Sequence, residues 1–344
     1  MHNLVRENIK LLKPYSSARH EFTGKASVFL DANENPFGST LSEDFNRYPD
    51  PLQWQLKFQI TRIKGVPAEN IFVGNGSDEV IDLAFRIFCN PGVDNVIVCP
   101  PTYGMYEVSA NINNVALKKV PLTKDFQLDV EGILEAADEH SKLLFVCSPN
   151  NPTGNNMNRQ DVETLLNNFN GIVLIDEAYI NYSRQKTFIQ ELTQYPNLIV
   201  MQTLSKAWGL AALRLGLCYA SLDVIDLFNK VKPPYNINLA SQELALQALQ
   251  QTQQVNDWIQ ITVNERNALA NSLKAFSFVE KVYDSDANFI LVRVTDADGL
   301  YDYLAGKETV VRNRSKEPLC QGCLRITIGT PDENKTLINL LKAF

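Results

Sequence analysis

Five short runs of consecutive apolar residues, each followed by a longer amphipathic segment, constrain the fold of this chain more than any other feature. Within each run the apolar residues are continuous rather than alternating with polar ones, as in strands buried on both faces. The segment 80–88 between two of them repeats apolar residues at helical spacing. This alternation predicts an α/β fold with a mainly parallel sheet. The runs span residues 71–73, 96–99, 143–146, 172–175 and 198–201.

The pattern changes at Lys232-Pro233-Pro234, and we expect a second, smaller domain after it. A helical stretch over 241–276, strand-like runs at 289–292 and 324–328, and a closing amphipathic helix predict an α+β arrangement there. A length of 344 residues also exceeds what one core usually serves. The expected organisation is an N-terminal arm over 1–27, a large domain over 28–232 and a small domain over 233–344.

Composition excludes several classes of protein. A hydrophobic fraction of 45% is that of an ordinary folded protein rather than a disordered one. The net charge of −7 argues against a general nucleic-acid binder, although it permits a local basic pocket for a small anion. The sequence has neither the layout of a signal peptide nor an apolar run approaching the ~18 residues of a membrane helix. We therefore expect a cytoplasmic protein without membrane or nucleic-acid partners.

The six cysteines and three histidines give little indication of a metal site. Cys99 and Cys147 lie in apolar runs and read as small buried hydrophobes. Only Cys320 and Cys323 form a CxxC, and one such pair without a second pair or a nearby histidine is a weak indication of zinc or redox chemistry. We expect no metal, and the sequence leaves the purpose of this CxxC pair open.

Chemically useful side chains follow each of the five predicted strands. In open α/β sheets, ligands bind just beyond the carboxyl ends of the strands, so these positions are expected to converge on one edge. They supply a carboxylate, two tyrosines, an amide, hydroxyls, a glycine-rich turn and a lysine. Each has an ordinary structural explanation when taken singly, but their joint occurrence at five strand ends is an improbable coincidence. The segments are 74–78, 100–104, 148–154, 176–179 and 203–206.

The glycine-rich turn is neither of the common nucleotide-binding motifs. Glu79 occupies the third glycine position of the dinucleotide fingerprint, and the Gly-Lys-Ser/Thr ending of a P-loop is missing. Gly76 and Ser77 at the start of a helix can still offer free backbone N–H groups and a hydroxyl to a phosphate. Asp78 and Glu79 would repel that phosphate unless they point away. The alternative is that the glycines serve only a tight turn.

Pyridoxal phosphate is a cofactor that requires this whole set of side chains. It needs a lysine for a Schiff base and a carboxylate that keeps its pyridine nitrogen protonated. Its ring needs an aromatic face, its phenolate oxygen needs a hydrogen-bond donor, and its phosphate needs a cradle. The strand ends therefore predict a pyridoxal-phosphate site.

Three blocks of the sequence resemble the signatures of the fold-type I, class II aminotransferases. They are Ser-Pro-Asn-Asn-Pro-Thr-Gly at 148–154, Asp-Glu-Ala-Tyr at 176–179, and Ser-Lys-Ala-Trp-Gly-Leu-Ala-x-Leu-Arg-Leu-Gly at 205–216. The pieces at 31–36, 47–51 and 324–330 further resemble the histidinol-phosphate aminotransferases within that family. The resemblance runs over essentially the whole chain. It implies a large domain with a mainly parallel central sheet flanked by helices, and a smaller α+β C-terminal domain.

The resemblance also implies a role for each residue around the cofactor. Lys206 would carry the Schiff base and shuttle the proton, and Asp176 would pair with the pyridinium nitrogen. Asn151 and Tyr179 would donate to the phenolate oxygen, with Tyr179 counted among the catalytic residues, and Tyr103 would stack on the ring. The cofactor phosphate is expected to be held by the backbone of Gly76, Ser77 and Asp78, together with Thr203, Ser205 and Arg214.

The substrate residues come from the resemblance as well. Arg325 matches the arginine that clamps the α-carboxylate of the substrate, and its fork can also bind a phosphate. Arg312 falls where the family places a second phosphate contact, the alternative being a solvated basic loop. Tyr15 and Asn33 fall where the family lines the substrate pocket. Tyr48 falls where the family reaches the partner subunit's cofactor phosphate, a role that requires a homodimer.

The implied reaction interconverts L-histidinol phosphate plus 2-oxoglutarate with imidazole-acetol phosphate plus L-glutamate, a step of histidine biosynthesis. The alternatives are an aromatic-amino-acid aminotransferase or a phosphothreonine-type decarboxylase of the same fold, because these enzymes share the cofactor set. A non-catalytic binding protein is less favoured, since it need keep neither Lys206 nor Asp176. The breadth of donor specificity is not readable from the sequence.

Overall fold

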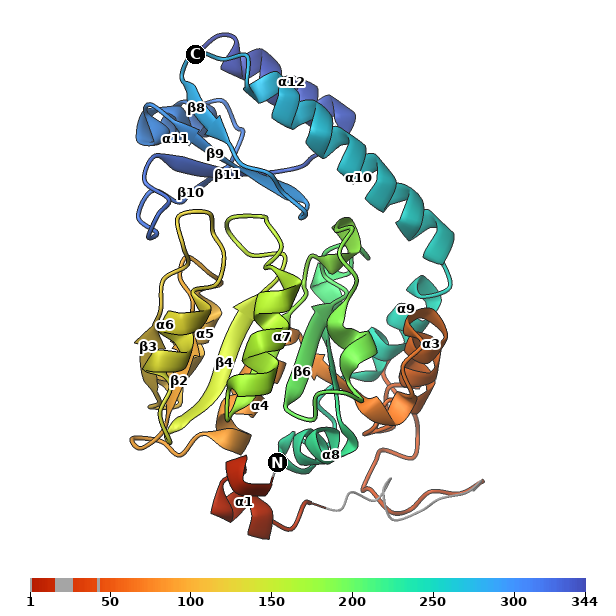
Figure 1. Ribbon diagram of the computed structural model, residues 1–344. Coiled ribbons are helices and arrows are strands. Elements are labelled where there is room, and N and C mark those ends of the chain that lie inside the picture. The colour runs from red at the N-terminus through yellow and green to blue at the C-terminus, as the bar shows by residue number, and fades with distance from the viewer. Residues whose placement is uncertain (1, 16–26, 42–43) are drawn as a thin grey trace.

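The five apolar runs form five strands of a seven-stranded sheet in the structure, a computed structural model that describes residues 2–15, 27–41 and 44–344 (Figure 1). The strands are β1 (Ile71–Asn75), β2 (Asn95–Val98), β3 (Ala116–Lys119), β4 (Ser141–Cys147), β5 (Ile172–Asp176), β6 (Leu198–Thr203) and β7 (Leu215–Ala220). Their order is β1-β7-β6-β5-β4-β2-β3. The pairs from β6 to β3 are all parallel, so the predicted mainly parallel sheet is confirmed.

Two strands of this sheet were not among the predicted runs, for different reasons. β3 lies at the sheet edge, where its Leu117 and Lys118 are only half-buried, and so it lacks a continuous apolar run. β7 is fully buried but antiparallel to both β1 and β6. It follows β6 after a short connection, and a short connection returns the chain in the opposite direction.

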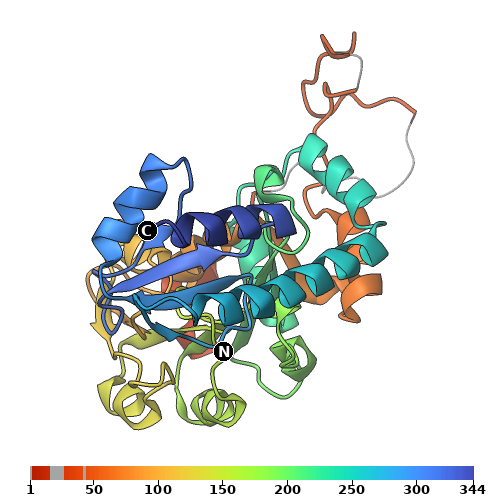
Figure 2. The same ribbon diagram turned by 90° about the horizontal axis from the view of Figure 1, so that it is seen from above.

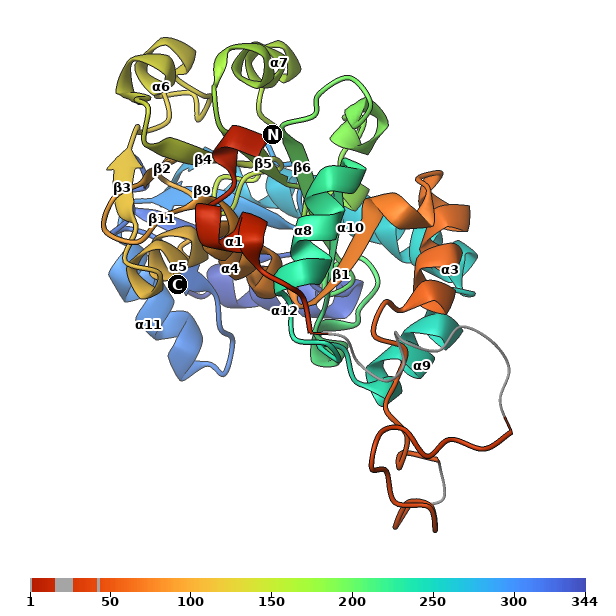
Figure 3. The ribbon, with the colours of Figure 1, turned by 90° about the horizontal axis from the view of Figure 1, so that it is seen from below.

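Helices cover both faces of the large sheet, which explains why its strands are continuously apolar (Figure 3). One face is covered by α1 (Glu7–Leu11), α4 (Ser77–Phe88), α5 (Met105–Ile112) and α8 (Leu222–Val231). The other is covered by α6 (Val130–Ala136) and α7 (Arg159–Asn168). Beyond β1 lie α3 (Trp54–Lys64) and α9 (Leu239–Ala248), which pack on each other.

A second, antiparallel sheet follows in the C-terminal part of the chain. It consists of β8 (Val279–Val282), β9 (Phe289–Val294), β10 (Arg312–Asn313) and β11 (Cys323–Thr327), in the order β10-β11-β9-β8. Three helices, α10 (Thr252–Leu273), α11 (Ala297–Gly306) and α12 (Pro331–Leu341), share a core with it. Figure 2 shows α10 and α12 side by side over this sheet.

The single helical stretch predicted over 241–276 is wrong in one respect, because α9 ends at Ala248 and α10 begins at Thr252. The break separates two packing environments. α9 packs on α3 beside the large sheet, whereas α10 runs on to contact β8 and β9 of the small sheet (Figure 1). The apolar pattern on each side of the break is helical, so periodicity did not reveal it.

The start of the chain is partly packed against the large sheet. Val5 and Ile9 are buried in the same core as α4, and the Arg6 N–H donates to the carbonyl oxygen of Ile87 at 3.1 Å. Residues 16–26 of the predicted arm lie outside the described residues. The predicted boundaries after residues 27 and 232 therefore stay predictions.

The two sheets face each other across the carboxyl ends of the parallel strands (Figure 1). This arrangement places the loops after β1, β2, β4, β5 and β6 opposite β9, β10 and β11. Among the described residues, no helix has the length and apolar character needed to cross a membrane.

Candidate active site

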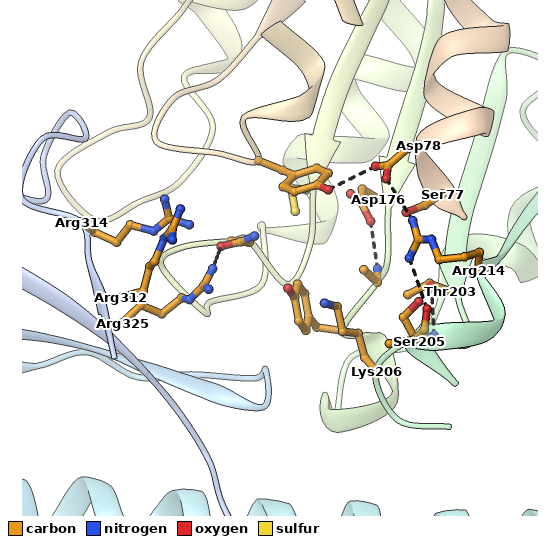
Figure 4. A pocket seen from close by; sticks show the side chains of 16 residues that line it. Ser77, Asp78, Asp176, Thr203, Ser205, Lys206, Arg214, Arg312, Arg314 and Arg325 are labelled. Atoms are coloured by element: carbon orange, nitrogen blue, oxygen red, sulfur yellow. Dashed lines mark hydrogen bonds and ion pairs between the residues drawn. The ribbon is translucent and has the colours of Figure 1, made fainter. Parts of the chain in front are cut away.

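A cavity of about 400 Å³ lies at the carboxyl ends of the parallel strands, where the small sheet faces them (Figure 4). Most of the residues predicted from the strand ends line it, together with arginines of the small sheet. The lining residues are Ser77, Asp78, Tyr103, Cys147, Asn151, Asp176, Ala178, Tyr179, Thr203, Ser205, Lys206, Ala211, Arg214, Arg312, Arg314 and Arg325.

Asp176, the last residue of β5, is buried at the floor of this cavity. Its Oδ2 accepts the hydroxyl of Tyr106 at 2.7 Å, and its Oδ1 accepts the Ala178 N–H at 3.0 Å. Burial raises the pKa of Asp176 to about 6, although both hydrogen bonds and the nearby Lys206 oppose that rise. The carboxylate is therefore fixed in place and ready to pair with a cation.

Lys206 projects into the cavity from the connection after β6, with its Nζ 5.6 Å from the ring centre of Tyr179 (Figure 4). Burial lowers its pKa, and the positive charge of Arg325 lowers it further. A larger share of the amine is then neutral at a given pH, which makes Lys206 a better nucleophile and proton acceptor. Tyr179 itself packs edge-on against Phe289 of β9, with ring centroids 5.1 Å apart.

One end of the cavity is built around the N-terminus of α4. The helix begins at Ser77, and no described side chain caps its first N–H groups. Arg214 lies beside it and adopts a left-handed φ of 56°, a conformation that typically costs a non-glycine residue about 1 kcal/mol or more. Glycine suits position 76, because its φ of 75° lies in a region that residues with a side chain rarely adopt. Ser205 and Thr203 complete this end, which is suited to bind an anion.

The two acidic residues of the turn behave differently. Glu79 points away from the cavity, where its Oε2 accepts the side-chain amide of Asn236 at 2.9 Å. Asp78 instead faces the cavity, accepts the hydroxyl of Tyr103 at 3.2 Å and pairs with Nη2 of Arg214 at 3.3 Å. Glu79 thus points away from the expected phosphate site, as that site requires. Asp78 does not, but the positive charge of Arg214 offsets its negative charge.

The small sheet supplies the opposite end of the cavity (Figure 4). Arg325 of β11 donates from Nη1 to Oδ1 of Asn151 and lies 5.2 Å over the ring of Phe289. Arg312 lies across the ladder from it, since β10 pairs Arg312 with Arg325. Arg312 thus lines the cavity, as expected for an anion contact, although it is exposed.

Apart from Gly76, which directly precedes Ser77 in the turn, three predicted residues do not line this cavity. Tyr48 is half-exposed and stacks on Tyr235 with ring centroids 4.5 Å apart. Tyr15 is 74% exposed, and Asn33 is exposed with a φ of 54°. Within a single chain, the structure does not bring them to the site.

Sequence reasoning missed two residues near the site. Tyr106 lies within the apolar face of α5, and nothing in its spacing signals that its hydroxyl reaches Asp176. Arg314 lies in the basic loop after β10 and was treated as part of a possible solvated segment, yet it lines the cavity. Its spacing from Arg312 could have indicated this position, because residues two apart in a strand point to the same face of the sheet.

The cysteines form no metal site in the described ranges, where no group of three or more His, Cys, Asp or Glu side chains could hold an ion. All six are buried. Cys320 and Cys323 close a tight turn, in which the Cys323 N–H donates to the carbonyl oxygen of Cys320 at 2.9 Å, directly before β11.

The chain is similar in sequence to aminotransferases over nearly its whole length. It matches the family described as aminotransferase class I and II over residues 25–341. It is 52% identical over 342 residues to the histidinol-phosphate aminotransferase of Cytophaga hutchinsonii, which covers 99% of this chain and 98% of that protein. It is 54% identical over 340 residues to that of Parabacteroides distasonis, covering 99% and 97%.

The fold is likewise shared with a solved structure. The histidinol-phosphate aminotransferase of Sinorhizobium meliloti, in complex with pyridoxal-5'-phosphate, superposes with a TM-score of 0.78 at 24% identity, over 91% of this chain and 88% of that one. This agreement confirms the predicted large α/β unit with its mainly parallel sheet and smaller C-terminal sheet. Because the sequence match spans nearly the entire chain, the protein belongs to the aminotransferase class I and II family.

Proposed function

We propose that this chain is a pyridoxal-phosphate-dependent histidinol-phosphate aminotransferase, which passes an amino group between L-histidinol phosphate and 2-oxoglutarate. The observation that carries the proposal is one cavity with a cationic group at each of two ends and Lys206 between them (Figure 4). One end fits the cofactor phosphate, and the other fits an anionic group of the substrate. Relatives that are about half identical over their full length carry this name.

The residues present fit pyridoxal phosphate. The uncapped first turn of α4 and Arg214 suit its phosphate, and the buried carboxylate of Asp176 suits a protonated ring nitrogen. The amine of Lys206 is suited to bond to the carbonyl carbon of the cofactor as a Schiff base. When bound, the cofactor supplies a conjugated ring that stabilises negative charge on the substrate carbon.

The chain's own residues divide the remaining work. Lys206 would hold the cofactor through its carbonyl carbon, and its Nζ, whose pKa is lowered, would accept and return a proton at the substrate carbon. Asp176 would pair with the protonated ring nitrogen, and that positive charge would lower its pKa below the raised value of about 6 in the cofactor-free site. The Tyr106 hydroxyl orients that carboxylate. Tyr179 and Asn151, which line the cavity, would donate hydrogen bonds to the phenolate oxygen of the cofactor.

Arg325 and Arg312 are proposed to bind the anionic group of the substrate. The guanidinium fork of Arg325 suits the α-carboxylate of glutamate and equally the phosphate of the other donor. Arg325 lines the cavity, where its guanidinium can meet an incoming anion. One site can thereby serve both half-reactions.

We also propose a homodimer, in which Tyr48 reaches the partner subunit's cofactor phosphate. Its position outside the cavity of its own chain supports this role. Leu30 and Phe37, on the same segment of chain, are 88% and 96% exposed, as expected of apolar side chains that a second subunit covers. Substrate contacts by Tyr15 and Asn33, and a cytoplasmic location, stay predictions.

A panel of single half-reactions tests this proposal. The holoenzyme is mixed in turn with histidinol phosphate, glutamate, an aromatic amino acid and phosphothreonine, and the visible absorbance of the bound cofactor is followed. We expect rapid bleaching with the first two and recovery on adding 2-oxoglutarate. Release of carbon dioxide from phosphothreonine, or bleaching by the aromatic amino acid but not by histidinol phosphate, would assign the chain to one of the alternative reactions.

A further inference from the structure

Three arginines share one face of the small sheet at the substrate end of the cavity. β10 pairs Arg312 directly with Arg325 of β11. The ladder continues past the end of β10, since the Arg314 N–H donates to the carbonyl oxygen of Cys323 at 2.9 Å. Side chains two residues apart on a strand point to the same face, so Arg314 joins Arg312 and Arg325 there. All three line the cavity (Figure 4).

This cluster is short of negative charge. Like charges across a strand pair are destabilising, so the three guanidinium groups repel one another unless an anion lies among them. The carboxylate nearest Arg314 is that of Glu317, whose Oε1 lies 3.5 Å from Nη1, at the long end of an ion pair. The Nε atoms of both Arg314 and Arg325 are buried and lack partners among the residues described.

The repulsion among the arginines lowers their pKa values. Burial lowers the pKa of Arg325, and the charge of Arg314 lowers it further, more than that of Arg312 does. Burial likewise lowers the pKa of Arg314, with Arg312 adding to the effect and Glu317 opposing it. Arg314 is therefore electrically coupled to the arginine that is proposed to clamp the substrate.

We propose that Arg314 is a specificity-determining residue, the third guanidinium of the substrate-anion subsite, which favours a phosphate ester over a carboxylate. This inference rests on the proposed function and assigns its selectivity to a residue of this chain. A carboxylate carries one charge on two oxygens and is satisfied by a single guanidinium fork. A phosphate ester carries close to two charges on three oxygens at pH 7, and so gains from further guanidinium groups.

Glu317 is the group that competes with the substrate for Arg314. Its side chain is 37% exposed, so it can turn to solvent when an anion takes its place. Its neighbour Lys316 is an exposed cation on the same loop that does not line the cavity, and it offers a charge-matched control.

The test measures kcat and KM for histidinol phosphate and for glutamate in Arg314→Gln, Glu317→Gln and Lys316→Gln holoenzymes. We expect Arg314→Gln to raise KM for histidinol phosphate by about tenfold or more, because a hydrogen bond to a charged group is lost, and to affect glutamate several-fold less. Glu317→Gln should lower KM for histidinol phosphate, and Lys316→Gln should change neither substrate. Arg314→Lys, which keeps the charge but loses the fork, should lie between wild type and Arg314→Gln.

Equal losses for both substrates in Arg314→Gln, or no loss at all, would overturn this role. If that variant fails to fold, the ratio of the two losses in Arg314→Lys decides the question in the same way. A wild-type enzyme that does not react with histidinol phosphate would instead mean that the proposed function is wrong. The two failures are therefore distinguishable.

Discussion

Asp176 and Glu177 are adjacent carboxylates that the structure uses in unlike ways. Asp176 faces the cavity. Glu177 is buried away from it, where it accepts the hydroxyl of Thr187, the Phe188 N–H at 2.7 Å and the amide of Gln202 at 2.8 Å. Position at the strand end predicts one carboxylate in the site, but which of two neighbours faces the site depends on the strand's orientation.

The buried charge of Asp176 predicts opposite effects of Asp176→Asn on stability and on activity. The folded-state pKa of Asp176, about 6, exceeds the unfolded value of 3.8, so its ionisation lowers the free energy of unfolding. This loss is absent below about pH 4, grows between pH 4 and 6, and is complete above 6. At neutral pH it is on the order of 3 kcal/mol in the cofactor-free protein. Asp176→Asn should therefore raise the Tm of that form at pH 7 while lowering kcat of the holoenzyme by orders of magnitude.

Glu177→Gln is the matched comparison. Burial raises the pKa of Glu177 too, but its carboxylate accepts three hydrogen bonds that a glutamine amide cannot all accept. Glu177→Gln should therefore lower Tm while leaving the activity of the folded fraction near that of wild type. Thermal melts from pH 4 to 8 and steady-state turnover check both variants. Near-normal turnover of the Asp176→Asn enzyme would contradict the proposal that Asp176 pairs with the protonated ring nitrogen of the cofactor.

At the scale of elements, five strands buried along most of their length were readable from the sequence, whereas β3 and the buried β7 were not. The run in β5 is buried throughout, so its residues must all be apolar until Asp176. β3 lies at the edge and ends in two lysines. β7 begins inside the family block at 205–216, with no long amphipathic helix between it and β6. Edge exposure and chain reversal are set by tertiary packing, which a local pattern does not encode.

One close contact between elements is directly testable. Gly216 of β7 lies against the turn before α4, and a Cβ on it would come 2.3 Å from both the carbonyl carbon of Gly76 and the backbone nitrogen of Ser77. Backbone atoms cannot yield as a side chain can. Gly216→Ala should therefore displace the turn, cost about 1–3 kcal/mol of stability and weaken binding of pyridoxal phosphate by about tenfold or more.

Gly104→Ala serves as its control, because a Cβ there has no heavy atom within 4 Å and the backbone is helical. Titration of each cofactor-free variant with pyridoxal phosphate gives the comparison. Equal affinities for the two variants would show that the turn before α4 does not hold the cofactor phosphate.

At the scale of the whole molecule, the site depends on both sheets. The strand-end rule predicted the part on the large sheet, because parallel strands bring their carboxyl ends to one edge. Arg312 and Arg325 came only from resemblance, since nothing local shows that β10 and β11 face that edge. The burial of Arg314 and the reach of Tyr106 needed the packed structure.

The proposed dimer predicts complementation between two defective subunits. A Lys206→Ala subunit lacks the Schiff-base lysine, and a Tyr48→Ala subunit lacks the side chain offered to its partner. In the mixed dimer, one site combines Lys206 of one subunit with Tyr48 of the partner subunit and is intact. After unfolding and refolding the two variants together, we expect more activity than the sum of the separately refolded samples. Activity equal to that sum would contradict a shared site.

The central claim is that this cavity moves an amino group from histidinol phosphate to 2-oxoglutarate. Its most direct test is to incubate the holoenzyme with ¹⁵N-labelled histidinol phosphate and unlabelled 2-oxoglutarate, and to follow the label by mass spectrometry. The account predicts ¹⁵N-glutamate in equal amount to imidazole-acetol phosphate, and none with Lys206→Ala. Label that remains in histidinol phosphate with the wild-type holoenzyme would contradict it.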